Sequence, residues 1–292
     1  MEEMTFNIQR SFKGVKTSGT LYLVPTPIGN MQDMTLRSLE TLKNVDLICS
    51  EDTRNTLRLL NHFEIKVPQE SFHEHNSQEK IPKLVEFLRS GKSIAQVSDA
   101  GMPSISDPGH DLVLAAIAQQ IDVVALPGAS AGITALIASG LVAQPHIFYG
   151  FLPRKKGEQR KFFTSKLAYP ETQIFYESPF RVADTLANMQ EVYGDRPVVL
   201  VRELTKIYEE YRRGKISEVL DSLTEQPIKG ECLIIVAGAC EDVALIEQAE
   251  SSPLEAVQNL IATGAKPNVA IKQIAKERGL NRQELYAQFH EL

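Results

Sequence analysis

Three turns rich in glycine, proline and serine contain much of this sequence's potential for chemistry. They span residues 25–30, 98–109 and 127–131. Glycine and proline fix tight turns, and glycine also lets a ligand approach the main chain closely. The polar groups of these turns are main-chain amides, serine hydroxyls and one or two carboxylates. Such a lining suits adenine, a ribose diol and an amino-acid head group, and it suits a triphosphate poorly.

A basic stretch is the second chemical feature. It carries five cations and one acid, Glu158, in a chain whose formal net charge is −6. The cations are Arg154, Lys155, Lys156, Arg160 and Lys161. Because phosphates attract Lys and Arg, the stretch predicts a nucleic-acid contact even though the whole chain is acidic. The alternative is a solvated helix start, which is the usual role of a charge run.

Several familiar sites do not occur in the sequence. It has no G-x-G-x-x-G after the first predicted strand, no G-x-x-x-x-G-K-[ST] and no G-x-S-x-G, which argues against dinucleotide enzymes, nucleoside triphosphatases and serine hydrolases. Residues 73–75 lack the spacing of metal ligands, and Cys49, Cys232 and Cys240 are too scattered for a zinc site or a disulfide framework. No run approaches the roughly 20 apolar residues of a membrane span. We therefore expect a soluble, cytoplasmic protein without a metal site.

The turns need a sheet to position them. In the first half of the 292 residues, β-prone runs alternate with helical patterns, which predicts a mostly parallel sheet covered on both faces. Strands are predicted at 21–24, 45–49, 93–97 and 122–126. Helices are predicted after Asp33 as N-cap, over 80–89, over 108–119 with Asp107 as N-cap, and over 130–139. Since ligands bind outside the carboxyl ends of such strands, the turns should line one pocket.

The second half predicts a different arrangement. Strands are predicted at 146–151, 173–176, 198–203, 209–213 and 231–237, with helices at 160–167, 181–193 and 217–223. The short link from 203 to 209 indicates an antiparallel hairpin in a mixed sheet. Helical patterns at 253–263, 268–278 and 282–292 have helix-turn-helix spacing, although a plain surface patch explains them as well. The predicted organisation is a disordered tail at 1–18, lobes at 19–140 and 141–240, and a helical appendage at 250–292.

Six parts of the sequence resemble a branch of the tetrapyrrole-methylase family whose members methylate small-subunit ribosomal RNA. They are 24–30 with 33–37, 51–54, 98–109, 127–131, 175–181 and 201–206. The resemblance implies a two-lobed α/β fold, a small C-terminal helical appendage, a homodimer and S-adenosylmethionine as cofactor. It also implies these cofactor contacts: Pro25, Thr26, Pro27, Ile28, Gly29, Asp99, Gly101, Pro103, Ile105, Ser130, Ala131 and Tyr176. The family's Gly-Asp-Pro motif is replaced here by Asp-Ala-Gly-Met-Pro at 99–103, which leaves the contact of Asp99 open.

The reaction implied by the resemblance is methylation of a cytidine ribose 2′-hydroxyl, in free RNA or in an assembled small subunit. The protein mainly has to place the hydroxyl in line with the methyl group, and a base should take the proton of this weak acid. Glu177 is the first candidate for the base and Asp52 the second, although an ion pair with Arg181 explains Glu177 equally well. The candidate RNA contacts are Arg54, Arg154, Lys155, Lys156, Arg160, Lys161 and Arg181. For Arg54, the alternative is pairing with the acids before it.

Two other functions stay open on the sequence. One is C-methylation of a corrin or porphyrin precursor, which the basic stretch disfavours. The other is a non-catalytic RNA-binding module that uses the C-terminal helices, and the complete set of cofactor turns argues against it.

Overall fold

A computed structural model describes residues 8–10, 18–105, 107, 109–239, 252–262 and 265–290. The predicted disordered tail, 1–18, lies outside these ranges except for 8–10 and 18. The chain divides into two compact units. The first contains the chain up to Ala138 together with Val201–Tyr211, and the second contains Ser139–Leu200 and the chain from Arg212 onwards. The domain boundaries expected from the sequence stay predictions, and each unit is described by itself.

The first unit is built on a parallel sheet of five strands in the order β3-β2-β4-β1-β5. The strands are β1 (Thr20–Leu23), β2 (Leu47–Ser50), β3 (Gln69–Ser71), β4 (Ile94–Gln96) and β5 (Asp122–Ala125). The strand β3 was not predicted, because its three half-buried residues, Gln-Glu-Ser, carry no apolar run. Since all five strands are parallel, their carboxyl ends share one edge, and the turns after β1, β4 and β5 begin there.

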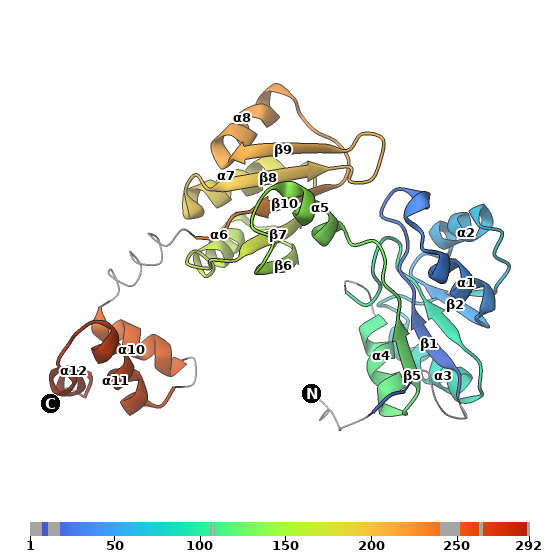
Figure 1. Ribbon diagram of the computed structural model, residues 1–292, viewed down its shortest axis with the longest axis horizontal. Coiled ribbons are helices and arrows are strands. Elements are labelled where there is room, and N and C mark those ends of the chain that lie inside the picture. The colour runs from blue at the N-terminus through green and yellow to red at the C-terminus, as the bar shows by residue number, and fades with distance from the viewer. Residues whose placement is uncertain are drawn as a thin grey trace. The chain divides into compact units, whose positions relative to one another are not determined.

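Helices cover both faces of this sheet (Figure 1). They are α1 (Leu36–Asn44), α2 (Thr53–His62), α3 (Ser77–Arg89) and α4 (Gly109–Ala118), and a further helix, α5 (Ala131–Ser139), follows the turn after β5. Leu84 of α3 and Leu112 of α4 belong to a buried cluster on one face. Leu42 of α1 and Leu59 of α2 belong to a second cluster on the other face. Helices on both sides explain why the inner strands β2 and β4 are buried along their whole length.

The start of α1 differs from the prediction. Asp33 does not cap the helix, because it ends a short 3₁₀ turn, η1 (Met31–Asp33), and Thr35 is the N-cap. The Thr35 hydroxyl oxygen accepts a hydrogen bond from the Ser38 amide at 3.0 Å. Leu36, the first residue of the helix, is 85% exposed. By contrast, the Asp107 carboxylate accepts from the amides of Ser104 and Gly109 at the start of α4.

The second unit contains a mixed sheet in the order β6-β7-β10-β8-β9, which confirms the predicted mixed arrangement. Its strands are β6 (His146–Phe151), β7 (Thr172–Glu177), β8 (Pro197–Arg202), β9 (Glu210–Lys215) and β10 (Cys232–Val236). The strands β6 and β7 are parallel, whereas β10 pairs with β7 in the antiparallel direction.

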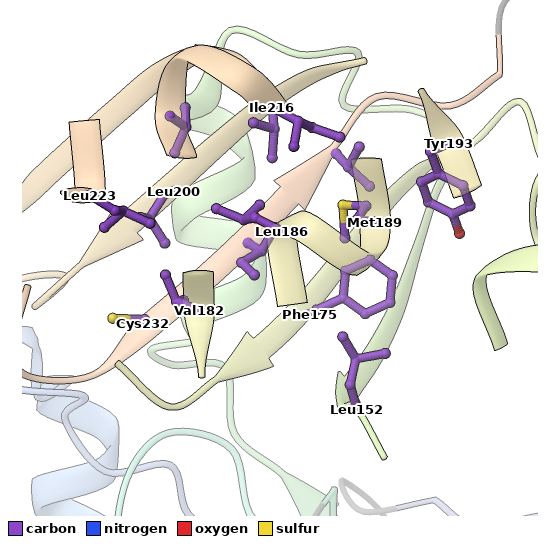
Figure 2. Close-up of a cluster of buried hydrophobic side chains, with 14 of the residues drawn as sticks. Leu152, Phe175, Val182, Leu186, Met189, Tyr193, Leu200, Ile216, Leu223 and Cys232 are labelled. Atoms are coloured by element: carbon purple, nitrogen blue, oxygen red, sulfur yellow. The ribbon is translucent and has the colours of Figure 1, made fainter. Parts of the chain in front are cut away.

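Three helices pack on this sheet through one apolar core. They are α6 (Lys156–Thr164), α7 (Val182–Tyr193) and α8 (Ile216–Glu225). Figure 2 shows the core, in which Leu186 and Met189 of α7 lie with Phe175 of β7 and Leu200 of β8. At its border the Tyr193 hydroxyl donates to the Gln173 side-chain oxygen at 2.7 Å, so the buried ring keeps a partner for its polar end.

A group of helices ends the described chain. It consists of α10 (Pro253–Ala262), α11 (Pro267–Glu277) and α12 (Arg282–Phe289). Val257, Ile271 and Leu285, one from each helix, are buried together. The three predicted helical patterns are therefore present, and they have a small core of their own.

Candidate functional site

The turns after β1 and β4 are joined by main-chain hydrogen bonds. Thr26 and Gly101 exchange two of them, each 3.0 Å from amide nitrogen to carbonyl oxygen. The Thr26 hydroxyl donates to the carbonyl oxygen of Ser98 at 3.0 Å, and the Ser98 hydroxyl donates to that of Gly101 at 2.9 Å. Thr26 is 4% exposed. The two turns are thus locked together by buried bonds that do not depend on charge.

The turn after β5 packs against the same junction. A Cβ atom on Gly128 would lie 2.2 Å from Cγ of Pro25, and one on Gly101 would lie 3.2 Å from Cγ2 of Ile28 and 3.4 Å from the carbonyl oxygen of Ala129. Gly101 also has a φ of +80°, which other residues rarely adopt. These contacts bring the turns after β1, β4 and β5 together. We call the place where Pro25, Thr26, Gly101 and Gly128 meet the glycine junction.

The remaining predicted cofactor residues differ in their surroundings. Pro27, Ile28, Ser130 and Ala131 are half-buried near the junction's turns, and Gly29 is exposed. Farther along the turn after β4, Pro103 is buried, whereas Ile105 is 61% exposed. Tyr176 belongs to the second unit, where its ring contacts those of Phe148 and Phe151. Whether any of these residues binds a cofactor stays a prediction.

Asp99 holds the start of α2 in place. Its carboxylate accepts from the Asp52 amide at 3.2 Å and from the Asn55 side-chain amide at 3.0 Å. Asp99 thus caps the loop before α2, and both oxygens of this predicted cofactor contact accept hydrogen bonds within the protein. Since Gly101 pairs with Thr26, the same loop connects α2 to the glycine junction.

Asp52 and Arg54 form an ion pair at the first turn of α2. Asp52 is the N-cap, and its carboxylate accepts from the amide and the guanidinium of Arg54 at 2.8–3.1 Å. The hydrogen bonds from the Arg54 side chain and amide lower the pKa of Asp52 to about 2. A carboxylate with so low a pKa is a weak base at neutral pH, and Arg54 already has a partner.

Glu51, one residue earlier, has the opposite surroundings. Within the described part of the chain its exposed carboxylate has no hydrogen bond or ion pair. Partial desolvation, followed by the nearby carboxylates of Asp99 and Asp107, raises the pKa of Glu51. The sequence does not distinguish Glu51 from Asp52 as a base, because the difference depends on which side chains lie around each carboxylate in the folded chain.

Glu177 is buried and fully hydrogen-bonded. Its side chain has no exposed surface, and its oxygens accept from the Ser178 amide at 2.8 Å, the Arg181 guanidinium at 2.6 Å and the Thr185 hydroxyl at 2.8 Å. The predicted alternative, an ion pair with Arg181, is therefore present. These bonds tie the end of β7 to the first turns of α7.

The basic stretch forms the start of α6, and several of its cations are paired. Lys155 lies 3.2 Å from Glu158, and both Lys156 and Arg160 contact Glu191 on α7. Arg154 and Lys161 are exposed, and neither forms an ion pair with another described residue. Exposed pairs of this kind are weak, so the cations stay available to a phosphate.

The model of the family described as Tetrapyrrole (Corrin/Porphyrin) Methylases matches residues 20–220. The chain belongs to the tetrapyrrole methylase family. Two similar proteins have the name Ribosomal RNA small subunit methyltransferase I. The one from Streptococcus pyogenes serotype M1 is 68% identical over 285 residues, covering 98% of this chain and 99% of the relative. The one from Bacillus subtilis (strain 168) is 48% identical over 285 residues, covering 97% and 98%.

Solved structures confirm the predicted tetrapyrrole-methylase fold. A cobalt precorrin-4 methyltransferase superposes with a TM-score of 0.55 over 75% of this chain and 94% of its own, at 16% identity. A uroporphyrin-III-C-methyltransferase from Thermus thermophilus gives 0.52 over 79% and 98%, at 19% identity. At such identities the likeness concerns the fold alone.

This tetrapyrrole methylase also has a hollow that the sequence analysis did not predict. It is lined by Gly29, Asn30 and Met31 after β1 and by residues of the loop between β8 and β9, which the contacts group with the first unit. The sequence indicated only that 201–206 resembles the family. This loop contains two non-glycine residues with positive φ, Glu203 and Thr205. Because neither residue type favours positive φ, the shape of the loop could not be predicted from the sequence.

Neither a metal site nor a membrane span is found in the described ranges. No group of three or more His, Cys, Asp or Glu side chains there could hold a metal ion. No helix in those ranges is long and apolar enough to cross a membrane.

Proposed function

We propose that this chain transfers the methyl group of S-adenosylmethionine to a ribose 2′-hydroxyl of a cytidine in small-subunit ribosomal RNA. The observation that carries the proposal is the relative with 68% identity across nearly the whole of both chains, whose name states the RNA substrate. The glycine junction supports this proposal. Its turns provide main-chain groups at the place where we expect a member of this family to bind a methyl donor.

The residues at the junction fit the cofactor. S-adenosylmethionine supplies a methyl group on a sulfonium sulfur, which is already a good electrophile. Gly128 and Gly101 allow the turns to close, since a Cβ on either would press into a neighbouring turn. Pro25–Gly29, Gly101, Ser130 and Ala131 would hold the donor. The first amides of α5 have no partner inside the helix and favour a carboxylate such as that of the amino-acid head group.

The 2′-hydroxyl proton needs an acceptor. The predicted bases, Glu177 and Asp52, are both engaged, the first in a buried hydrogen-bond network and the second with Arg54. We add Glu51 as the stronger candidate, since its exposed carboxylate has a raised pKa and lies beside the loop of Asp99. A carboxylate whose pKa is nearer to the working pH transfers protons more effectively.

Partners follow from the same proposal. The substrate is small-subunit RNA or the 30S subunit, which would place the protein in the cytoplasm. We also propose a homodimer, supported by the exposure of Ile133 (45%) and Ile137 (74%) on α5. Exposed apolar side chains that gather on one helix are typical of a protein interface. Sedimentation of the purified protein at several concentrations tests the dimer.

Incubation with labelled S-adenosylmethionine and unmodified 30S subunits tests the function. We expect label in the RNA, and nucleoside analysis should assign it to a 2′-O-methylated cytidine. Label in a corrin or porphyrin precursor and none in RNA would instead support tetrapyrrole methylation, the activity for which the two solved structures are named. RNA binding without any transfer would support a non-catalytic module.

A further inference from the structure

The hollow beside Gly29 has the size of a small-molecule site. Its volume is about 730 Å³, and ligand pockets span roughly 300–1,000 Å³. One wall is Gly29–Met31, which continues directly from the cofactor turn predicted at Pro25–Gly29. The other wall is formed by Glu203 and Thr205–Tyr208. A methyl acceptor has to lie next to the methyl donor, so this position suits the acceptor.

The two walls are in close contact. A Cβ on Gly29 would lie 2.6 Å from Cγ of Lys206 and 3.0 Å from the Thr205 hydroxyl oxygen. That hydroxyl is buried and has no hydrogen-bond partner among the described residues. It is therefore an unsatisfied polar atom next to the hollow, which an ordered water molecule or ion at this position would explain.

The loop is held in a strained shape. Glu203 has a φ of +50° and Thr205 a φ of +67°, and positive φ is an outlier for a β-branched residue. The Thr205 amide donates to the Glu209 carboxylate at 2.7 Å, and the Lys206 ammonium donates to the Glu203 carboxylate at 3.0 Å. Strain that the surroundings enforce concentrates at ligand sites, because it fixes the geometry before the ligand arrives.

The rim of the hollow is apolar and aromatic. Ile207 is 91% exposed and Tyr208 68% exposed, although both are large side chains. The charged groups inside, Glu203 and Lys206, neutralise one another. A neutral planar ring with polar edges fits this lining better than a tetrapyrrole ring with many carboxylates, which would meet Glu203 without a surplus of cations. An exposed tyrosine is also a common platform for an unstacked nucleobase.

We propose that this hollow binds one unstacked ribonucleotide of the RNA substrate, with its base against Tyr208 and Ile207. The inference rests on the proposed function and extends it, since it names the residues that present the acceptor nucleotide.

The test combines substitutions at Tyr208 with two separate readouts. Tyr208→Ala should raise the KM for 30S subunits about tenfold, because one base–aromatic stack is lost. Tyr208→Phe keeps the ring and should stay near the wild-type KM. Ile207→Glu, a second exposed position, should raise the KM by placing a negative charge near the RNA. Calorimetry with S-adenosylhomocysteine should give the wild-type affinity for all three variants.

Each other outcome has a distinct meaning. An unchanged KM for both Tyr208→Ala and Ile207→Glu would overturn the inference while leaving the methyl transfer in place. An equal loss of S-adenosylhomocysteine affinity would also overturn it, since the hollow would then belong to the cofactor. If the wild-type protein methylates no RNA, the proposed function fails. This outcome is seen with the wild-type protein alone and is therefore distinct from a failure of the inference about the hollow.

Discussion

The glycine junction of the first unit and the Glu177 network of the second use polar groups in opposite ways. At the junction, main-chain bonds between Thr26 and Gly101 hold the turns, and the nearby Glu51 carboxylate keeps no partner among the described residues. Around Glu177, three donors occupy both carboxylate oxygens. A group that stabilises its own fold completely is costly to recruit for chemistry. We therefore assign the chemistry to the first region and the structural role to the second.

The Glu177 network extends this contrast to the basic stretch. The Gln159 side-chain amide donates to the carbonyl oxygen of Pro153 at 2.9 Å and to the Thr185 hydroxyl at 3.3 Å. Thr185 in turn donates to Glu177, and the Asn188 amide donates to Gln159 at 2.8 Å. The network thus holds the start of α6 against α7 and the end of β7. In the proposed function, Glu177 would therefore act on RNA binding only through the position of α6.

The largest expected effect is on stability. Glu177→Ala removes one partner of a buried ion pair and leaves Arg181 and Thr185 without their acceptor. Because Arg181 is 31% exposed, we expect a loss of about 2–4 kcal/mol in the free energy of unfolding, somewhat below the usual figure for a fully buried pair. Urea denaturation measures it. Glu79→Ala, which breaks the exposed pair with Lys83, is the matched control and should leave the free energy of unfolding nearly unchanged.

The next effect separates two neighbouring carboxylates. Glu51→Gln should lower kcat about 100-fold if Glu51 accepts the proton, whereas Asp52→Asn should lower it only a few-fold. The wild-type rate should fall as the pH drops through the raised pKa of Glu51, because only the deprotonated form is a base. That acid limb should disappear in Glu51→Gln. A wild-type pH profile in Glu51→Gln would return the role to Glu177 or Asp52.

The smallest effect concerns the cations of α6. Replacing Lys155 and Lys156 with Ala should weaken RNA binding and reduce the slope of log affinity against log salt by about 1.4, as expected for two phosphate contacts on a single strand. Filter binding over a salt series measures it. Lys83→Ala removes a comparable exposed cation from α3 and should leave the slope unchanged. Loss of cofactor affinity in the double variant would show that the segment is structural.

Much of the fold could be predicted because the strands and turns are local features. The apolar composition of 21–24 predicts a strand, and the prolines and glycine of 25–30 predict a turn. The cap of α1 was misassigned, since Asp33 and Thr35 are both good caps and the 3₁₀ turn that uses Asp33 decides between them. Pairings such as Asp99 with the start of α2, or Lys156 with Glu191, join residues far apart in the chain. Such long-range pairings cannot be predicted from a local sequence pattern.

The most direct measurement is calorimetric titration of the wild-type protein, Gly128→Ala and Gly157→Ala with S-adenosylmethionine and S-adenosylhomocysteine. We expect that the wild type binds both and that Gly128→Ala binds at least about tenfold more weakly, because its Cβ would press into Pro25. Gly157→Ala, whose Cβ meets no atom within 4 Å, should bind as the wild type does. If the wild-type protein binds neither compound and instead binds a nucleoside triphosphate or a dinucleotide, the glycine junction is not a methyl-donor site.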